Sequence, residues 1–310
     1  MIRRLGPAVL ALLLLTVAAC GNGNGKRVAG GRGPFIEVNG HDLFYECSGR
    51  GRPVVVLESG LDADHSAWQW VQGVVARFTR VCSYDRAGLG RSSGAAAQRG
   101  IDDLVDDLHR LLHAAGIDGP YVLAGHSFGG LIVHQYASTY PADVAGMVLV
   151  DSAHPDQAKR YIRTLATPRF ARRLIARRLR AYLSHPGANA EGVDAVAAYA
   201  RARAAGPLDD KPLAVITAGR ENNPALGRRL KRALDAVWLG LQRELAQLST
   251  DSIQVIASRS GHDVISPQGQ PALVVEAIHE VLQAVRTGSR LGPCRAGIFN
   301  VFGGRCVPQR

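Results

Sequence analysis

Apolar and polar positions follow two different periods along most of the chain. Short runs rich in Val, Ile and Leu, such as "PVVVLESG" at 53–60 and "YVLAGHS" at 121–127, predict buried strands. Longer segments carry apolar residues at helical spacing. One of them, "IDDLVDDLHRLLHAAG" at 101–116, places these residues on one face and ends on glycine. Strands that alternate with helices indicate a mainly parallel sheet in an α/β domain.

The same patterns assign most of the chain to eight strands and four helices. The first two strands form a hairpin over residues 35–49 that turns at Asn39-Gly40. The other strands are predicted at 53–60, 80–85, 121–127, 145–153, 212–219 and 251–261. Helices are predicted at 68–78, 101–116, 129–141 and 271–285.

The alternation stops between Pro155 and Asp210, where the pattern is helical throughout. An insertion of this size after a strand predicts a cap over the carboxyl ends of the strands. Residues 156–205 contain eleven Lys and Arg against three Asp and Glu, so this segment holds most of the net charge of +11. No aromatic-basic interleaving accompanies the charge, which argues against nucleic acid as a partner. Two alternatives stay open, a face that meets anionic lipid head groups and an ordinary solvated helix face.

The first twenty residues predict a signal peptide. Arg3 and Arg4 precede 15 uncharged residues, a run that is short for a membrane span and typical of a signal-peptide core. The run ends in "VAAC", which resembles the lipobox of bacterial lipoproteins and makes Cys20 the expected site of lipidation. The alternative is an ordinary secretory signal with an incidental cysteine. Residues 21–34, rich in Gly and Asn, predict a flexible tether, and in either case the protein is expected to be exported.

Export permits disulfide bonds. Apart from Cys20, the chain has four cysteines, and two of them, Cys294 and Cys306, lie in a Gly- and Pro-containing tail beyond the last predicted helix. A local bridge between these two is expected, which leaves Cys47 and Cys82. Neither a CxxC motif nor clustered histidines accompany the cysteines, so no metal site is predicted.

One serine stands out because of the glycines on both sides of it. Residues 125–129 read Gly-His-Ser-Phe-Gly, with an apolar strand pattern before them and a helical pattern after them. A serine on a sharp strand-to-helix turn needs small neighbours, because side chains at the flanking positions would meet nearby backbone. The start of the helix offers N–H groups to a developing oxyanion. Ser127 is therefore the expected nucleophile.

This motif and three other segments resemble the α/β-hydrolase superfamily, over about residues 35–285. "LESGLDADHSAW" at 57–68 is similar to the oxyanion loop of that family, with Ser59-Gly60 in place of His-Gly. The resemblance implies that the backbone N–H groups of Leu61 and Phe128 bind the oxyanion. "YDRAGLGRSS" at 84–93 is similar to a structural loop in which Asp85 and Arg86 pair or cap. "SGHDVISPQGQPALVVEAI" at 260–278 is similar to the histidine loop and last helix, which makes His262 the general base.

The acid of the triad has two candidates. Most relatives in the superfamily place it after the seventh strand, where this chain offers Glu221. A minority place it after the sixth, where Asp151 ends the strand "GMVLVD". A carboxylate at either place would orient the imidazole and stabilise its charged form. Asp151 is the preferred candidate and Glu221 the alternative.

The resemblance also implies the architecture. It predicts an α/β-hydrolase fold in which a mostly parallel, eight-stranded sheet has helices on both faces and a helical cap after strand 6. The expected segments are a signal at 1–20, a tether at 21–34, core segments at 35–154 and 211–287, the cap at 155–210 and a tail at 288–310. The strand order of the family places the strand near Cys47 beside the one with Cys82, so a cross-strand disulfide is reasonable.

The implied activity is hydrolysis of an ester or amide through an acyl-enzyme, without a cofactor or metal, most simply by an esterase or lipase. Two alternatives are an aminopeptidase of the proline-iminopeptidase type and a non-catalytic binding protein of the cell envelope. The acidic residues with which an aminopeptidase cap binds the substrate amine are scarce in this basic cap. The expected partners are a small ester or amide and, through Cys20, a bacterial cell membrane.

Overall fold

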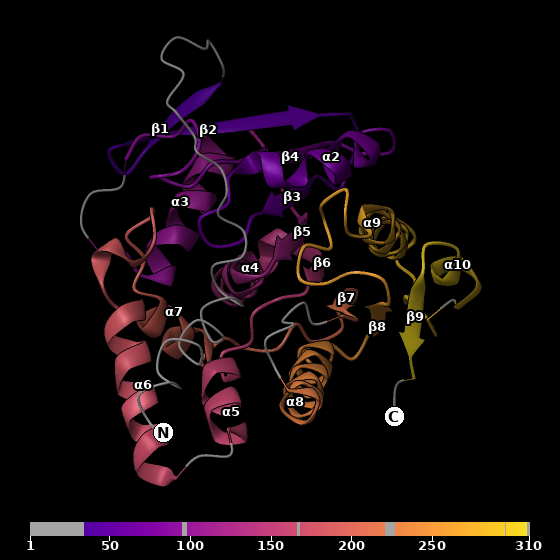
Figure 1. Ribbon diagram of the computed structural model, residues 1–310. Coiled ribbons are helices and arrows are strands. Elements are labelled where there is room, and N and C mark those ends of the chain that lie inside the picture. The colour runs from indigo at the N-terminus through magenta and orange to yellow at the C-terminus, as the bar shows by residue number, and fades with distance from the viewer. Residues whose placement is uncertain (1–33, 95–97, 166–167, 221–226, 295, 309–310) are drawn as a thin grey trace.

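A nine-stranded, mostly parallel sheet forms the centre of the protein (Figure 1). The computed structural model describes residues 34–308 except 95–97, 166–167, 221–226 and 295. The strands are β1 (Phe35–Val38), β2 (His41–Ser48), β3 (Val55–Glu58), β4 (Val81–Tyr84), β5 (Tyr121–His126), β6 (Val144–Val150), β7 (Leu213–Ala218), β8 (Ser252–Ala257) and β9 (Gly304–Val307). Their spatial order is β1-β2-β4-β3-β5-β6-β7-β8-β9. The pairs β1–β2, β2–β4 and β8–β9 are antiparallel, and the others are parallel.

Helices cover both faces of this sheet. The α-helices are α2 (Gln69–Val75), α3 (Ile101–Ala114), α4 (Phe128–Thr139), α5 (Gln157–Thr164), α6 (Arg169–Leu183), α7 (Ala195–Ala202), α8 (Arg228–Ala246), α9 (Pro271–Thr287) and α10 (Ala296–Val301). α2 and α9 contact each other on one face, and α3 and α4 contact each other on the opposite face. α5, α6 and α7 lie together on the side of the molecule away from α9 and α10 (Figure 1). None of the described helices is long and apolar enough to cross a membrane.

The strand residues alternate between two cores. Val55 and Leu57 of β3 pack into the core beneath α2 and α9, whereas Val56 between them packs into the core beneath α3 and α4. All four residues of β3 are buried. Burial on both faces explains why the central strands are apolar at every position instead of at every second one.

The predicted parallel sheet with helices on both faces is confirmed, but the predicted strand count of eight is wrong. The tail adds a ninth strand, β9, which pairs with the edge strand β8 from Gln254↔Val307 to Ala257↔Gly304. The tail folds back because Cys294 is bonded to Cys306 within β9, and this bond closes the turn that contains α10. The pairing gives the backbone of β8 a partner at an edge that would otherwise be open.

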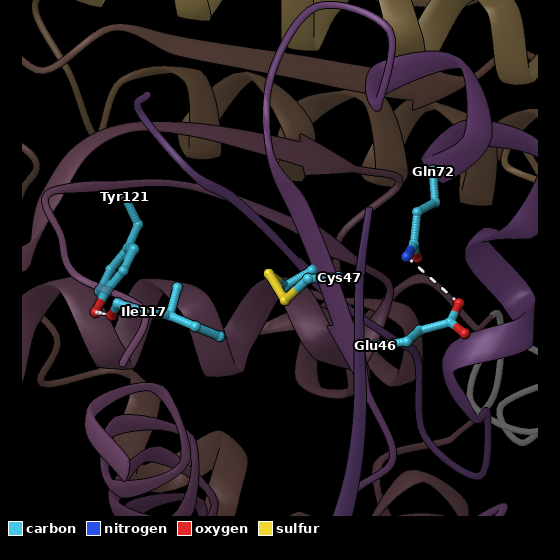
Figure 2. The surroundings of a disulfide bond; sticks show 6 residues. Glu46, Cys47, Gln72, Ile117 and Tyr121 are labelled. Atoms are coloured by element: carbon cyan, nitrogen blue, oxygen red, sulfur yellow. Dashed lines mark hydrogen bonds between the residues drawn. A yellow bond between two sulfur atoms is a disulfide. The ribbon is translucent and has the colours of Figure 1, made fainter. Parts of the chain in front are cut away.

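Both expected disulfides are confirmed. Cys47 lies directly opposite Cys82 in the β2–β4 ladder and is bonded to it. Figure 2 shows this bridge on one side of β2, while the Glu46 carboxylate points to the other side and accepts a hydrogen bond from Gln72 of α2 at 3.4 Å. The second disulfide, Cys294–Cys306, ties the tail to the sheet. The predicted signal segment, Cys20 and most of the tether lie outside the described residues.

Candidate active site

Ser127 lies at the turn between β5 and α4, in a backbone conformation that non-glycine residues rarely adopt. Its φ is 55° and its ψ is −121°. A Cβ atom on Gly125 would lie 2.6 Å from the carbonyl oxygen of Gly129, and one on Gly129 would lie 2.4 Å from that of Glu58. Both glycines are therefore required by the close approach of backbone on either side of the turn. The strained serine is held with its side chain at the carboxyl end of the sheet.

Two further side chains, both far from Ser127 in sequence, complete a hydrogen-bonded chain. His262, in the loop between β8 and α9, has its Nε2 atom 2.9 Å from Ser127 Oγ. Its other ring nitrogen, Nδ1, lies 2.7 Å from Asp151 Oδ2. Asp151 directly follows β6, and its φ of 41° turns the carboxylate toward the histidine. The structure therefore brings together the serine, the histidine and the preferred acid of the sequence analysis. The alternative acid, Glu221, lies outside the described residues.

The second carboxylate oxygen of Asp151 is held by two donors. The backbone N–H of Ala218, at the end of β7, donates to Asp151 Oδ1 at 2.8 Å. The indole N–H of Trp238, on α8, donates to the same oxygen at 2.9 Å. These bonds fix the plane of the carboxylate and stabilise its charged form, as expected for a group that orients an imidazole. The sequence analysis identified neither α8 nor Trp238, and the only available signal was the rarity of tryptophan in this chain, which has three.

Replacing Trp238 with phenylalanine is expected to lower kcat about tenfold and to leave KM nearly unchanged. A hydrogen bond to a charged group contributes roughly 1.5–3 kcal/mol, and each 1.4 kcal/mol of transition-state energy is a factor of ten in rate. Trp70→Phe is a matched control because Trp70 is 51% exposed. Steady-state kinetics on both variants checks the prediction. Equal losses in the two variants would contradict a role for the Trp238–Asp151 bond.

His126 supports the histidine loop. The sequence analysis assigned it no role, since it points away from the nucleophile along the turn. Its Nε2 atom lies 2.9 Å from the backbone carbonyl oxygen of His262, and the centroids of the two rings are 4.8 Å apart. His126 therefore holds the backbone from which the His262 ring projects.

The two N–H groups expected to bind an oxyanion lie on either side of the serine. Phe128 is the first residue of α4, so its N–H has no acceptor within the helix. Leu61 follows β3 in the loop that begins at Ser59. Within the described part of the chain, neither N–H donates a hydrogen bond. Two buried N–H groups without an acceptor can donate hydrogen bonds to the oxyanion of a tetrahedral intermediate.

A buried ionic network holds the loop that carries Leu61. Arg86 donates from Nη1 to the backbone carbonyl of Ser59 at 2.8 Å and from Nη2 to that of Gly60 at 2.6 Å. Its charge is balanced by Glu58 and by Glu191, which lies in the cap and accepts from Arg86 Nε at 2.5 Å. Glu191 also accepts from the backbone N–H of Asp62 at 2.8 Å. The cap residue therefore fixes both the arginine and the loop.

The network shifts the pKa values of its members. Burial raises the pKa of Glu58, and the attraction of Arg86 only partly offsets this. Burial acts to lower the pKa of Arg86, but Glu191 and Glu58 outweigh it and hold the value well above its ordinary range. Asp85, beside Arg86, has a different role: it accepts from the backbone N–H groups of His65 at 2.7 Å and Arg91 at 2.8 Å. The two residues thus pair and cap, as the sequence predicts.

Replacing Glu191 with alanine is expected to destabilise the protein by about 3–5 kcal/mol, because removing one partner of a buried ion pair leaves Arg86 Nε and the Asp62 N–H without an acceptor. Arg86 and Glu191 are 3% and 0% exposed. Arg201→Ala is the control: it removes another pair between cap and core, with Asp102, whose side chains are 48% and 58% exposed. We expect this control to cost less than about 1 kcal/mol. Urea unfolding measures both free energies, and equal costs would contradict the prediction.

Three groups of side chains within the described residues place possible metal ligands near one another: His109, His113 and Asp143; Asp64, His65 and Asp85; and Glu276, His279 and Glu280. None of these three groups contains Ser127, His262 or Asp151. In the second group, Asp85 already accepts from the His65 ring and from two backbone N–H groups.

Comparisons with known proteins agree with this fold. A family model described as the alpha/beta hydrolase fold matches residues 52–185. The chain is 27% identical over 228 residues to the uncharacterized protein YqjL of Bacillus subtilis, which covers 73% of this chain and 82% of YqjL. It is 34% identical over 119 residues to a protein of Azorhizobium caulinodans named "Putative carbamate hydrolase RutD", which covers 38% of this chain and 44% of that protein. Among solved structures, the enol-lactonase of Burkholderia xenovorans superposes with a TM-score of 0.58 at 21% identity, over 81% of this chain and 100% of the lactonase.

Proposed function

We propose that this chain is a hydrolytic enzyme of the α/β-hydrolase superfamily, and that it is a serine hydrolase that cleaves a carboxylic ester through an acyl-enzyme. The observation that carries the proposal is the hydrogen-bonded chain from Ser127 Oγ through the His262 ring to Asp151, with distances of 2.9 and 2.7 Å. Ser127 acts as the nucleophile, His262 as the general base and then the general acid, and Asp151 orients the imidazole.

The proposed reaction has two halves. Ser127 Oγ attacks the ester carbonyl carbon while its proton passes to His262 Nε2, and the carbonyl oxygen becomes an oxyanion that accepts from the Leu61 and Phe128 N–H groups. The oxyanion collapses, and His262 returns the proton to the alcohol that leaves. Water then attacks the acyl-enzyme, with His262 again taking a proton, and releases the acid and free Ser127.

An ester substrate is favoured over the amine end of a peptide by the state of the acidic residues in the cap. Glu191 is paired with Arg86, Asp156 with Arg203, and Asp194 caps α7 by accepting from the backbone N–H of Ala197. These three are the acidic residues of positions 156–205, and each carboxylate already has a partner within the protein. Among the similar proteins, one is named a putative carbamate hydrolase and another an enol-lactonase, and a lactone is a cyclic ester.

The test is covalent labelling with a fluorophosphonate, which reacts with an activated serine. We expect the wild-type protein to be labelled at Ser127, as located by mass spectrometry of the peptide, and Ser127→Ala to remain unlabelled. A folded wild-type protein that does not react would favour the non-catalytic binding protein. p-Nitrophenyl esters and aminoacyl anilides, assayed side by side, distinguish an esterase from an aminopeptidase.

We also propose that the protein is exported and anchored to the outer side of a bacterial membrane by lipid on Cys20. The support is the charge pattern of residues 1–20 and the sequence "VAAC". The helical cap could add an electrostatic contact with anionic head groups, because α6 contains six arginines and no acidic residue. Cys20→Ser should move the protein from the membrane fraction to the soluble fraction. Unchanged fractionation would contradict the anchor.

A further inference from the structure

A cavity of about 560 Å³ lies inside the cap, between α5, α6 and α7. Every residue that lines it falls between Pro155 and Arg203, and Ser127, Asp151 and His262 are not among them. The cavity is therefore formed by the cap alone and is distinct from the candidate active site. Its volume is in the range of small-molecule binding sites.

The walls of this cavity are apolar. Tyr161 of α5 and Leu179 and Leu183 of α6 line it and are buried, and Ile162 and Val196 add to the same apolar cluster. Walls of this kind favour an aliphatic or aromatic body, because burial of an apolar group contributes about 25 cal/mol per Å².

One amide in the wall of this cavity has an oxygen without a hydrogen-bond donor. Gln157, on the first turn of α5, is 4% exposed and lines the cavity. Among the described residues, nothing donates a hydrogen bond to its Oε1 atom. An unsatisfied buried polar atom costs roughly 1–3 kcal/mol, so the wall of this cavity is less stable than a fully hydrogen-bonded one.

Arginines without acidic partners surround the same cavity. Arg163 of α5 and Arg173 and Arg180 of α6 line it, and no described carboxylate forms an ion pair with any of the three. Arg173 and Arg180 are seven residues apart, so they project from the same side of α6, about two turns from each other. Two of the other lining cations, Lys159 and Arg203, both pair with Asp156. These three positive charges at the rim of an apolar cavity favour a ligand with an anionic group.

We propose that the cap cavity binds an anionic amphiphile, with its apolar chain between α5, α6 and α7 and its carboxylate or phosphate group on Arg163, Arg173 and Arg180. The inference goes beyond ester hydrolysis, because binding at this site does not require the triad. The site is nevertheless close to it: Tyr199 lines the cavity, and its ring centroid is 6.3 Å from that of Phe128, which follows the serine.

The experiment is calorimetric titration of the Ser127→Ala protein with dodecanoate below its micelle concentration. Dodecyltrimethylammonium, with the same chain and the opposite charge, is the ligand control. We expect dodecanoate to bind at least tenfold more tightly than the cation. Arg173→Gln combined with Arg180→Gln should weaken dodecanoate binding at least tenfold, because both cavity arginines are neutralised.

The matched protein control is Arg177→Gln combined with Arg178→Gln, which removes the same charge from the same helix at positions that do not line the cavity. This control should change the dissociation constant less than twofold. Ala176→Trp, which fills the cavity from α6, should abolish binding, and Ala200→Trp tests the same point from α7. Circular dichroism verifies that each variant is folded.

Two results would overturn the proposal: equal weakening in the two arginine pairs, or undiminished binding in both folded tryptophan variants. The first would show that dodecanoate is attracted only by the net charge of α6. Because the titration uses a protein without the nucleophile, neither result depends on the fluorophosphonate labelling. The two proposals can therefore fail separately.

Discussion

Ser127→Ala is expected to lower kcat for ester hydrolysis by about 10⁶-fold, and His262→Ala by a similar factor. The two residues act as a unit, because the hydroxyl is a weak nucleophile unless the imidazole accepts its proton, and the imidazole has nothing to activate without the hydroxyl. The distance of 2.9 Å between Oγ and Nε2 is short enough for this transfer. The double variant should therefore be about as slow as either single variant.

Steady-state kinetics with a p-nitrophenyl ester measures all three variants. Ser93→Ala is the matched control, since Ser93 hydrogen-bonds to the backbone of Asp42 and lies outside the triad. It should retain wild-type kcat. Losses that multiply in the double variant would show that Ser127 and His262 act independently, and this outcome would remove the basis of the proposed mechanism.

Asp151→Asn is expected to lower kcat by about 10⁴-fold while the fold stays intact. The His262 Nδ1–H now donates to the carboxylate at 2.7 Å, which leaves Nε2 free to accept the serine proton. The amide that replaces Asp151 would also have to satisfy the Ala218 and Trp238 donors with its oxygen, so its NH₂ group would face the imidazole. The imidazole would then hold its proton on the wrong nitrogen.

Glu221→Gln is the control for the acid, because Glu221 is the alternative that the sequence leaves open. It should change kcat less than twofold in the same assay. A 10⁴-fold loss in Glu221→Gln together with a small loss in Asp151→Asn would reverse the assignment. Circular dichroism and urea unfolding distinguish a chemical effect from an unfolded protein.

The parts of the site that the sequence predicts are those with a local signature. Ser127 is found from two glycines between a strand and a helix, and His262 from its place before the last helix. The sheet is predicted because buried parallel strands are apolar at every position. Each of these features depends on residues that are close together in the chain.

The features that the sequence does not predict depend on contacts between distant residues. The Trp238–Asp151 bond joins residues 87 positions apart, and the Arg86–Glu191 bond joins residues 105 apart. No spacing rule connects such pairs, so the choice between two carboxylates needs coordinates. The strand β9 was missed because it is only four residues long, and Gly304–Val307 shows no clear alternation of apolar and polar residues.

The bond between Arg86 and Glu191 has a consequence for how substrate enters. The part of the cap around Glu191 is held against the core by the buried Arg86–Glu191 ion pair. Moving this part of the cap away from the core would therefore cost several kcal/mol. An entrance of constant width would then select esters by their cross-section. The rate of ester hydrolysis should rise smoothly with ester concentration. It should show no abrupt increase above the concentration at which the ester separates into droplets.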